Sequence, residues 1–523
     1  RVNAQGLVEN VQILSSNLVQ NGDFSEEGVQ EISNGSFSQE GVQEVSNGSF
    51  SQEGSELVTN GDFENGSTGW NLGSGWSIVS GVAISDGVSS NSNLFTNPFF
   101  SVSTLVKMTI SITNYVSGSL ELYLSSYSFE TITANGEYTF YTTADRPGGR
   151  LYLKSLNFNG SIDNVSVREV AQDWTLGGEV TMGDNLAHFE SNTNTYSYVR
   201  QDISSLTSKT YKIQLEVKNY VSGEVQVAFS GVSPISQNLN VSTDGVYTAY
   251  LTPNANGDDF EVSRRFLGGN FNFDITNISV KEAAQDWTLG TGWSIGEDKA
   301  TFDETIGGAG DIVQNSILTS GKSYKLTFDT LETNGGNLAY KLGGGYTFIS
   351  NIQANTTHTV YGVAGGSQFA LRGASDFIGS ITNISVKEVG QNWVLNDWSV
   401  GDSLISSGNT STLLQQFPIY TSTTSIYKTT FKAKSVNGTS VTLRVYDGAN
   451  SSGSYETFTI TSSDFQDFTF TRQRVGTDAG LSFFNNSGAE IEITNISVIE
   501  ITDDTNLPRI SYENFSYQDA LGS

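Results

Sequence analysis

The sequence contains no cysteine among its 523 residues. Disulfide bonds, thiolate metal sites and cysteine nucleophiles are therefore excluded. Histidine is almost as scarce, because His188 and His358 are the only two. No run of about 18 apolar residues is present, which excludes a membrane-spanning helix. Chemistry that needs thiols, clustered imidazoles or a bilayer is thus not expected of this chain.

Proline and basic residues are also few. Six Pro stand against 55 Gly, which is the composition of short strands joined by tight turns. The 26 basic residues are outnumbered by 55 acidic ones, for a net charge of −29 at pH 7. Such a charge opposes binding to a phosphate backbone by long-range repulsion. We expect no nucleic-acid or membrane partner, whereas hard cations such as calcium remain plausible ligands.

Internal repeats indicate how the chain is divided. The usual domain size of about 100–150 residues predicts three to five units. A string Asn-(Val/Ile)-Ser-Val begins at Asn164, Asn277, Asn383 and Asn495, and an (Asp/Asn)-Trp pair follows each of the first three copies. These landmarks predict four units, with the bounds 56–170, 171–283, 284–389 and 390–501. Residues 502–523 are expected to form a segment that joins a further domain.

Within each unit, apolar and polar residues alternate with a period of two. Tyr211-Lys-Ile-Gln-Leu-Glu-Val is one such run, and it continues into a turn signal at Asn219-Tyr-Val-Ser-Gly. Alternation of this kind places one strand face in a core and the other in water. We therefore predict an all-β chain of tandem antiparallel β-sandwiches, jelly-roll-like, in an elongated array.

The amino-terminal segment has a shorter period. After residues 1–16, Asn-Gly pairs and single Phe residues recur every 13 positions, the latter at Phe24, Phe37, Phe50 and Phe63. A 13-residue unit cannot bury its one Phe alone. We expect residues 17–55 to form a short β-repeat stalk in which two or three chains wrap together, a trimer being favoured. A flexible linker is the alternative.

The junction of these repeats with the first unit resembles a known module. Leu57-Val-Thr-Asn-Gly-Asp-Phe-Glu runs into Trp70 and Trp76, and the unit closes on Ile162-Asp-Asn-Val-Ser-Val. This layout resembles jelly-roll carbohydrate-binding modules of polysaccharide-degrading enzymes. The tandem copies, with their Asp-Trp-Thr-Leu-Gly joints, are also similar to virion fibre and appendage proteins of bacteriophages, particularly marine ones. The resemblance implies an extracellular structural protein of the virion surface.

Aromatic residues are the first candidates for a site. A Trp at the same place in every copy is expected to pack at the joint rather than to hold a ligand. Loops on a rigid sandwich carry binding more often. Candidate glycan contacts are Phe95, Phe99, Phe100, Tyr115 and Tyr123, with a place in the core as the alternative.

Calcium is the second candidate. The resemblance implies an ion held between the opening and closing strands of the first unit, where Asp62 or Glu64 and Asp163 stand at the matching positions. The alternative is that these carboxylates are solvated surface groups. No other cofactor is expected.

The sequence favours a non-catalytic protein. His188 and His358 lie in different copies, and no Gly-x-Ser-x-Gly elbow is present. The first hypothesis is a tail or head fibre or appendage that contacts other virion proteins and binds host-surface glycans weakly but multivalently. The alternative is a bacterial surface adhesin or an extracellular filament subunit assembling by strand addition. A third is a non-catalytic part of a polysaccharide-degrading enzyme.

Overall fold

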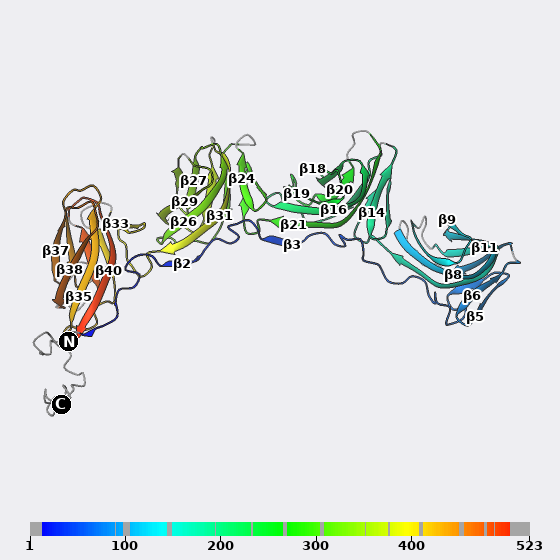
Figure 1. Cartoon of the computed structure of the whole chain (residues 1–523), viewed down its shortest axis with the longest axis horizontal. Coiled ribbons are helices and arrows are strands. Elements are labelled where there is room, and N and C mark those ends of the chain that lie inside the picture. The colour runs from blue at the N-terminus through cyan, green and yellow to red at the C-terminus, as the bar shows by residue number, and fades with distance from the viewer. Residues whose placement is uncertain are drawn as a thin grey trace, which may run out of the picture. The chain divides into compact units, whose positions relative to one another are not determined.

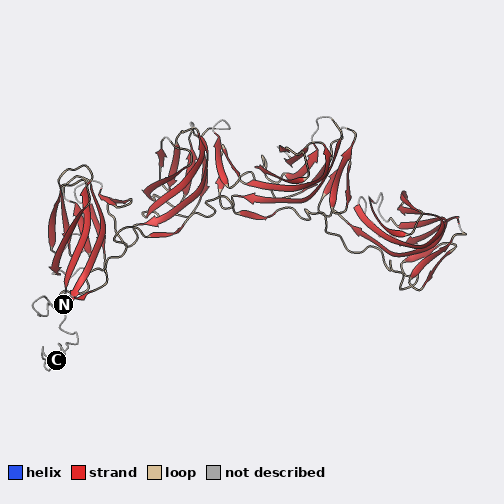
Figure 2. Cartoon of the chain, in the orientation of Figure 1, coloured by secondary structure: helices blue, strands red, loops and turns tan. Residues whose placement is uncertain are grey.

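A computed structural model describes most of the chain. The described residues are 13–88, 90–97, 105–143, 149–193, 195–231, 234–264, 269–303, 308–350, 352–374, 377–406, 412–448, 454–474, 479–485 and 487–502. Within these ranges every regular element is a β-strand (Figure 2). Among the same residues, no helix has the length and apolar character required to cross a bilayer. Their strands form four β-sandwiches, sandwich 1 to sandwich 4 in chain order, grouped in two compact units with sandwiches 3 and 4 in one and 1 and 2 in the other.

Sandwich 2 shows the common topology (Figure 1). Its strands are β12 (Thr175–Gly177), β13 (Val180–Gly183), β14 (Leu186–Ser191), β15 (Tyr198–Gln201), β16 (Thr210–Ser222), β17 (Val225–Ser230), β18 (Ile235–Leu239), β19 (Gly245–Leu251), β20 (Asp259–Arg264) and β21 (Phe271–Ala283). One sheet has the order β13-β14-β21-β16-β19 and the other β12-β15-β20-β17-β18. The eight strands from β14 to β21 thus follow the jelly-roll order.

Sandwiches 3 and 4 repeat this order. The strands of sandwich 3 are β22 (Thr288–Leu289), β23 (Trp293–Gly296), β24 (Lys299–Asp303), β25 (Gly310–Gln314), β26 (Ser323–Thr333), β27 (Leu338–Leu342), β28 (Tyr346–Ile349), β29 (Thr356–Val363), β30 (Phe369–Gly373) and β31 (Ile378–Val389). Those of sandwich 4 are β32 (Trp398–Val400), β33 (Leu404–Ser406), β34 (Thr412–Gln416), β35 (Ile426–Ser435), β36 (Val441–Tyr446), β37 (Tyr455–Ile460), β38 (Gln466–Gln473), β39 (Leu481–Asn485) and β40 (Ile491–Thr502).

Sandwich 1 differs because two of its strands pass from one sheet layer into the other without a break. Its strands are β4 (Trp70–Leu72), β5 (Trp76–Val79), β6 (Val82–Asp86), β7 (Ser90–Thr96), β8 (Leu105–Leu124), β9 (Tyr127–Ile132), β10 (Gly136–Thr143) and β11 (Leu151–Glu169). β8 pairs with β10 along its first half and with β9 along its second, while β11 pairs with β8 along both. All strands of this sandwich therefore belong to one eight-stranded sheet.

The cores follow from the period-two alternation of the sequence. Along β16 the side chains of Ile213, Leu215 and Val217 are at most 1% exposed, whereas the residues between them are partly exposed. Burying one such aliphatic side chain stabilises a fold by about 1.5–3 kcal/mol. The prediction of an all-β chain of tandem antiparallel, jelly-roll-like sandwiches is confirmed.

The amino-terminal repeats lie on the sandwiches in reverse order. We call residues 13–63 the strap; it contains the short strands β1 (Ile13–Leu14), β2 (Glu27–Gln30) and β3 (Glu40–Gln43). β1 pairs with β40 of sandwich 4, β2 with β31 of sandwich 3 and β3 with β21 of sandwich 2, and Glu56 bridges to Arg168 in sandwich 1. Figure 1 shows the blue strands β2 and β3 beside the ends of β31 and β21.

Candidate functional site

The docking of each repeat is centred on its Asn-Gly-x-Phe turn. The Asn (positions 21, 34, 47 and 60) and the Phe (positions 24, 37, 50 and 63) all have positive φ, between 48° and 60°. Such a φ is tolerated by Asn but uncommon for a bulky residue such as Phe. This turn aims the Phe ring at the sandwich, where it is at most 6% exposed in every repeat.

The Gly of each turn is required by a close approach between two backbones. A Cβ placed on Gly22, Gly35, Gly48 or Gly61 would lie 1.8–2.0 Å from the carbonyl oxygen of Ile496, Ile384, Ile278 or Val165, respectively. The amide of that same residue donates a hydrogen bond of 2.8–2.9 Å to the Gly carbonyl. Only a residue without a side chain fits in this contact.

The repeated Asn-(Val/Ile)-Ser-Val string forms the other half of the contact. Asn164, Asn277, Asn383 and Asn495 have φ between 50° and 53°. Each lies where the pairing register of the last strand shifts, which turns the next amide toward the strap. The two repeat families found in the sequence are therefore complementary parts of one groove, present once in each sandwich.

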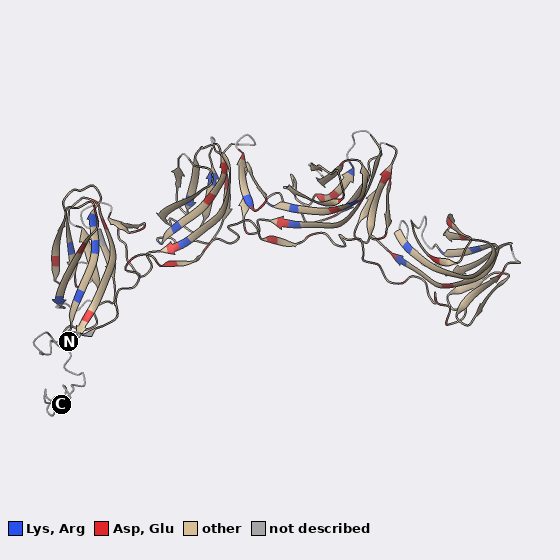
Figure 3. Ribbon diagram, viewed as in Figure 1, with Lys and Arg blue, Asp and Glu red and all other residues tan. Residues whose placement is uncertain are grey.

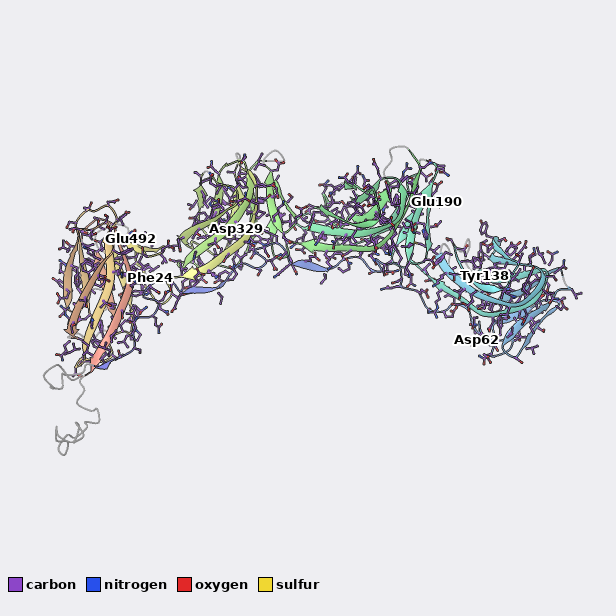
Figure 4. All side chains as sticks on the ribbon, viewed as in Figure 1. Phe24, Asp62, Tyr138, Glu190, Asp329 and Glu492 are labelled. Atoms are coloured by element: carbon purple, nitrogen blue, oxygen red, sulfur yellow. The ribbon has the colours of Figure 1, made fainter. Side chains whose placement is uncertain are left out.

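A tryptophan completes each groove. Phe24, which is labelled in Figure 4, packs on Trp393 with ring centroids 5.6 Å apart. The other three pairs have centroids 5.0–5.3 Å apart, namely Phe37 with Trp287, Phe50 with Trp174 and Phe63 with Trp70. Each indole N–H donates to the carbonyl of the repeat's Asn at 2.9–3.2 Å. The prediction that these Trp residues pack is confirmed by these contacts.

Electrostatic contacts flank three of the four grooves. Glu27 lies between Lys325 and Lys387, at 2.7 and 2.9 Å. Glu40 lies in the same way between Lys212 and Lys281, at 2.6 and 3.1 Å. Hydrogen bonds from these lysines lower the pKa of both carboxyl groups. Figure 3 shows the acidic segments of β2 and β3 beside the basic segments of β31 and β21.

The partner of each repeat differs from the one that the sequence favoured. We expected residues 17–55 to find their partners in neighbouring chains of a stalk, or to be a flexible linker. In the structure Val19, Ile32, Val45 and Val58 are 4–6% exposed, and the four Phe are buried with them, against sandwiches of the same chain. The physical reason for an interchain stalk, an apolar residue without a partner, is therefore removed.

The sheet on the other side of each sandwich carries a second feature, on its outward face. We call the sheet that pairs with the strap the docking sheet and the other the opposite sheet; in sandwich 1 the two names refer to the two layers of its single eight-stranded sheet. In sandwich 2, Val199 and Val262 of the opposite sheet point into the core, so their neighbours Arg200 and Glu261 point outward. Arg200 binds Glu261 through two hydrogen bonds of 2.6 and 3.0 Å and lies 4.5 Å from the centroid of the Tyr198 ring.

Sandwich 3 has the same groups in a different arrangement. Arg372 binds Asp311 at 2.7 and 3.0 Å and lies 3.8 Å from the centroid of the Tyr346 ring. The Tyr346 hydroxyl donates to Asp311 at 2.6 Å. Burial and this carboxylate raise the pKa of Tyr346 to about 12. Although burial opposes ionisation of Asp311, the hydrogen bonds from Arg372 and Tyr346 outweigh it and lower the pKa of the carboxyl group.

Sandwich 1 brings together two of the five aromatic residues that the sequence singled out. Phe95, Tyr152 and Tyr123 are register partners on three adjacent strands, and the Phe95 and Tyr152 rings stack with centroids 5.3 Å apart. Two residues along the same strands from Tyr152 and Tyr123, Lys154 binds Glu121 at 3.0 Å and lies 5.4 Å from the Tyr123 ring centroid. Sequence reasoning missed Tyr152 and Lys154, although the alternation of Leu151-Tyr-Leu-Lys places both on the outward face.

The remaining aromatic candidates do not join this row. Tyr115 donates to the carbonyl of Gly118 at 2.8 Å and packs 6.1 Å from the Phe158 ring, at the middle of β8. Its contacts are those of a residue that supports the crossing strand. Phe99 and Phe100 lie outside the described residues.

Sandwich 4 also has an aromatic cluster beside a cation, but the acid next to it is paired with a second cation from the docking sheet. Tyr446 packs on Tyr455 and Phe484, with ring centroids 5.0 and 6.3 Å away, and Arg444 lies 5.1 Å from the Tyr455 ring centroid. Arg472 of the docking sheet binds Glu456 at 2.6 Å. All four opposite sheets thus present aromatic rings beside a cation, at positions that differ from one sandwich to the next.

The predicted calcium ligands do not gather in one cluster. Asp62, labelled in Figure 4, accepts a long hydrogen bond of 3.4 Å from the Glu64 amide. Asp163 accepts one of 2.7 Å from the Asn164 amide. Within the part of the chain that is described, no group of three or more Asp, Glu or His side chains is arranged to hold a metal ion. Calcium binding in sandwich 1 therefore stays a prediction.

The two histidines are fixed by separate structural contacts. His188 is 2.6 Å from Asp274, which also accepts a hydrogen bond from Asn219. His358 stacks on Phe328, with centroids 5.1 Å apart, and lies 3.2 Å from the fully buried hydroxyl of Thr330. The two imidazoles thus belong to different sandwiches, and each is held by contacts within its own sandwich.

A cleft of about 720 Å³ lies at the joint between sandwiches 1 and 2. Tyr141 and Leu105 line it from sandwich 1, and Trp174 and Met182 line it from sandwich 2. The Asp184 amide donates to the Tyr141 hydroxyl at 3.0 Å and connects the two sandwiches. We interpret this cleft as part of the joint between the two sandwiches, because Trp174 in its lining also packs on Phe50 of the strap.

No protein-family model and no curated protein sequence matches the chain. Similar solved structures include the tandem CBM22-1–CBM22-2 domains of Paenibacillus barcinonensis Xyn10C, at 13% identity over 45% of this chain and 99% of that one, with a TM-score of 0.18. The Sulfolobus Turreted Icosahedral Virus structure matches at 12% identity over 61% and 90%, with a TM-score of 0.19.

A Paenibacillus xanthan lyase also matches, at 8% identity over 81% of this chain and 52% of that one, with a TM-score of 0.16. The set therefore mixes carbohydrate-binding modules, a viral structural protein and an enzyme. Because all three TM-scores are low, these likenesses carry no argument of their own. The jelly-roll assignment rests on the strand order of the chain itself.

Proposed function

We propose that this chain is a non-catalytic structural protein at the surface of a virus particle, an extracellular tail or head fibre or appendage of a bacteriophage. Its sandwiches bind glycans of the host surface weakly, through the opposite sheets. The observation that carries the proposal is the outward aromatic row Phe95, Tyr152 and Tyr123, with Lys154 and Glu121 beside it.

The chemistry of such a row suits a sugar. A pyranose ring presents an apolar C–H face that packs on aromatic rings, and its hydroxyls need donors and acceptors at the rim. The side chains of Lys154 and Glu121 are 25% and 22% exposed, and they supply both kinds of group. Because Lys154, Arg200 and Arg372 are each paired with an acid and the chain carries a charge of −29, the faces favour neutral over anionic glycans.

Multivalency gives weak faces a use. Four opposite sheets in one chain, and more in a homo-oligomer, raise the effective concentration of the second contact after the first. We propose a homotrimer that also contacts other virion proteins, and no nucleic-acid or membrane partner.

The test is binding of the full chain to an array of neutral and anionic glycans, followed by titration of the best binder. Tyr152→Ala should reduce the affinity of sandwich 1 for a neutral glycan at least about tenfold. Tyr127→Ala is the matched control, because this Tyr is 61% exposed but pairs with Leu124, away from the row. Equal effects of both substitutions, or a preference for anionic glycans only, would contradict the proposal.

One observation favours a second function. The strap adds a strand to the last strand of sandwiches 2, 3 and 4, and strand addition is a common means of joining subunits. A bacterial surface adhesin or filament subunit would use the same grooves between chains. Light scattering of the full chain over a range of concentrations separates the two, since the fibre proposal requires a closed oligomer of fixed mass and a filament requires open-ended growth.

A further inference from the structure

We propose that the strap contains a register key, so that each repeat is accepted by its own sandwich and the first repeat cannot exchange with the others. The key is the first position of the 13-residue period, occupied by Leu14, Glu27, Glu40 and Glu53. The partner is a pair of residues that face each other on two neighbouring strands of the docking sheet. This inference is independent of glycan binding.

Two cations face each other in three of the four sandwiches. Lys325 and Lys387 are direct register partners in sandwich 3, as are Lys212 and Lys281 in sandwich 2 and Lys107 and Arg168 in sandwich 1. Like charges directly opposite on adjacent strands destabilise a sheet. The Glu of the docked repeat lies between the two cations and neutralises them.

The distances follow the same pattern in all three sandwiches. Glu27 and Glu40 lie 2.6–3.1 Å from both of their lysines. Glu53 lies 2.8 Å from Lys107 and 3.8 Å from Arg168. An uncharged residue at this position would leave two cations opposed without a counter-charge.

Sandwich 4 lacks the second cation, and the first repeat lacks the acid. Lys428 is the register partner of Ile499, an apolar residue where the other sandwiches have Lys or Arg. The repeat that docks there supplies Leu14. A strap displaced by one repeat would place Leu14 between Lys325 and Lys387, and it would leave those two charges unneutralised.

The other end of the strap is fixed by the chain itself. Phe63 of the fourth repeat contacts Trp70, only seven residues later, so this repeat cannot leave sandwich 1 for another sandwich. The register is therefore set by covalent connection at sandwich 1 and by the Leu14 and Ile499 positions at sandwich 4.

The chain supplies its own test substitutions. Glu27→Leu gives the second repeat the residue that the first repeat has at this position, and Lys387→Ile gives sandwich 3 the residue that sandwich 4 has at this position. Hydrogen exchange in the full chain reads docking at the amides of Glu31 and Ile384, which donate to Val386 and Gly35 at 2.9 Å. We expect Glu27→Leu to lower protection of both amides about fivefold and the double substitution to restore it to within about twofold.

Two controls keep the test decisive. Val29→Leu changes an exposed strap residue of the same repeat and should leave protection unchanged, since Val29 is 76% exposed. The Leu326 amide on β26 reports whether sandwich 3 remains folded. An effect of the double substitution equal to the sum of the two single effects would overturn the proposal, and so would full protection in Glu27→Leu.

Discussion

The strap grooves and the opposite sheets use their residues in different ways. In the grooves the same residue types recur at the same positions, as the pairs Phe24–Trp393 and Phe63–Trp70 illustrate at the two ends of the strap. In the opposite sheets the residue types recur while the positions change. The cation is on the third strand of the sheet in sandwich 3 (Arg372) and on the second in sandwich 2 (Arg200).

This difference separates a structural requirement from a variable surface. A groove that must accept a repeated segment fixes the Gly, the Phe and the Trp, because the backbones touch. A face that only needs an aromatic ring beside polar groups can place them on any strand. Recurring positions within one chain therefore indicate packing here, whereas reshuffled positions are what we expect of the proposed glycan-binding faces.

The largest expected effect is on the docking sheet. Phe50→Ala removes a ring that is 2% exposed and packs on Trp174, so it should cost about 3–5 kcal/mol of docking free energy. The measurement is hydrogen exchange at the amides of Glu44 and Ile278, which donate to Val280 and Gly48. Phe348→Ala, at a 60% exposed ring on an opposite sheet, should change stability by less than about 0.5 kcal/mol. If the Ile278 amide in Phe50→Ala were as well protected from hydrogen exchange as in wild type, the contrast between the strap groove and the opposite sheet would be wrong.

A slightly smaller loss is expected for Gly48→Ala. The new Cβ would lie 2.0 Å from the Ile278 carbonyl oxygen, so the turn must move away and lose its hydrogen bond, at a cost of about 2–3 kcal/mol. Gly345→Ala is the control, because a Cβ there meets no atom within 4 Å. Similar stabilities of the two variants in urea unfolding would show that the close approach is not required.

An opposite-sheet substitution should have a smaller effect, confined to one sandwich. Tyr346→Phe removes the hydrogen bond to Asp311 and should cost about 1 kcal/mol in sandwich 3. Because the folded pKa of Tyr346 is about 12 and its ordinary value is 10.0, its contribution is fully present below pH 10 and is lost as pH rises toward 12. Ultraviolet titration of wild type and variant checks this, and a Tyr346 that ionises at pH 10 would contradict it.

The smallest effect concerns two acids of the strap. Burial and the nearby Glu388 raise the pKa of Glu31, and burial and Glu282 raise that of Glu44. Docking of repeats 2 and 3 should therefore strengthen as pH falls through these raised pKa values. It should weaken again at lower pH, where Glu27 and Glu40, whose pKa is lowered, become protonated.

The substitution Glu31→Gln should strengthen docking at pH 7 by less than about 1 kcal/mol, because it removes this penalty. Repeat 1 provides an internal control, since it has Leu18 at the same position. Protection of the Ile384 amide as a function of pH is the measurement. A variant with weaker docking than wild type at pH 7 would contradict the assignment.

Much of the fold could be predicted from sequence, because alternation with a period of two dictates strands, and repeated joints dictate sandwiches. The packing role of the Trp residues and the placement of Phe95 and Tyr123 on an outward face also follow from local pattern. The partner of the strap does not, because contacts such as Trp393 to Asn21 join residues far apart in the sequence. Periodicity reports that a Phe needs a partner but not which surface provides it.

Some signals in the sequence were nevertheless informative and were missed. Four Asn-Gly-x-Phe turns match four Asn-(Val/Ile)-Ser-Val strands in number, which is what one groove per sandwich requires. Leu14 and Ile499 depart from their repeats together, one in the strap and one in the sandwich on which that part of the strap docks. The proposed calcium site had no such second signal, since Asp62, Glu64 and Asp163 were chosen by position alone.

The central claim is that each repeat docks on its own sandwich of the same chain, and engineered disulfides test it most directly. The native chain has no cysteine, so paired substitutions at register partners give a clean result: Glu27→Cys with Val389→Cys, and Glu40→Cys with Ala283→Cys. At low protein concentration both pairs should oxidise to crosslinks within single chains, which run as single chains after denaturation. The exchanged pairs, Glu27→Cys with Ala283→Cys and Glu40→Cys with Val389→Cys, should remain reduced. Crosslinks that join separate chains, or equal yields for matched and exchanged pairs, would contradict the account.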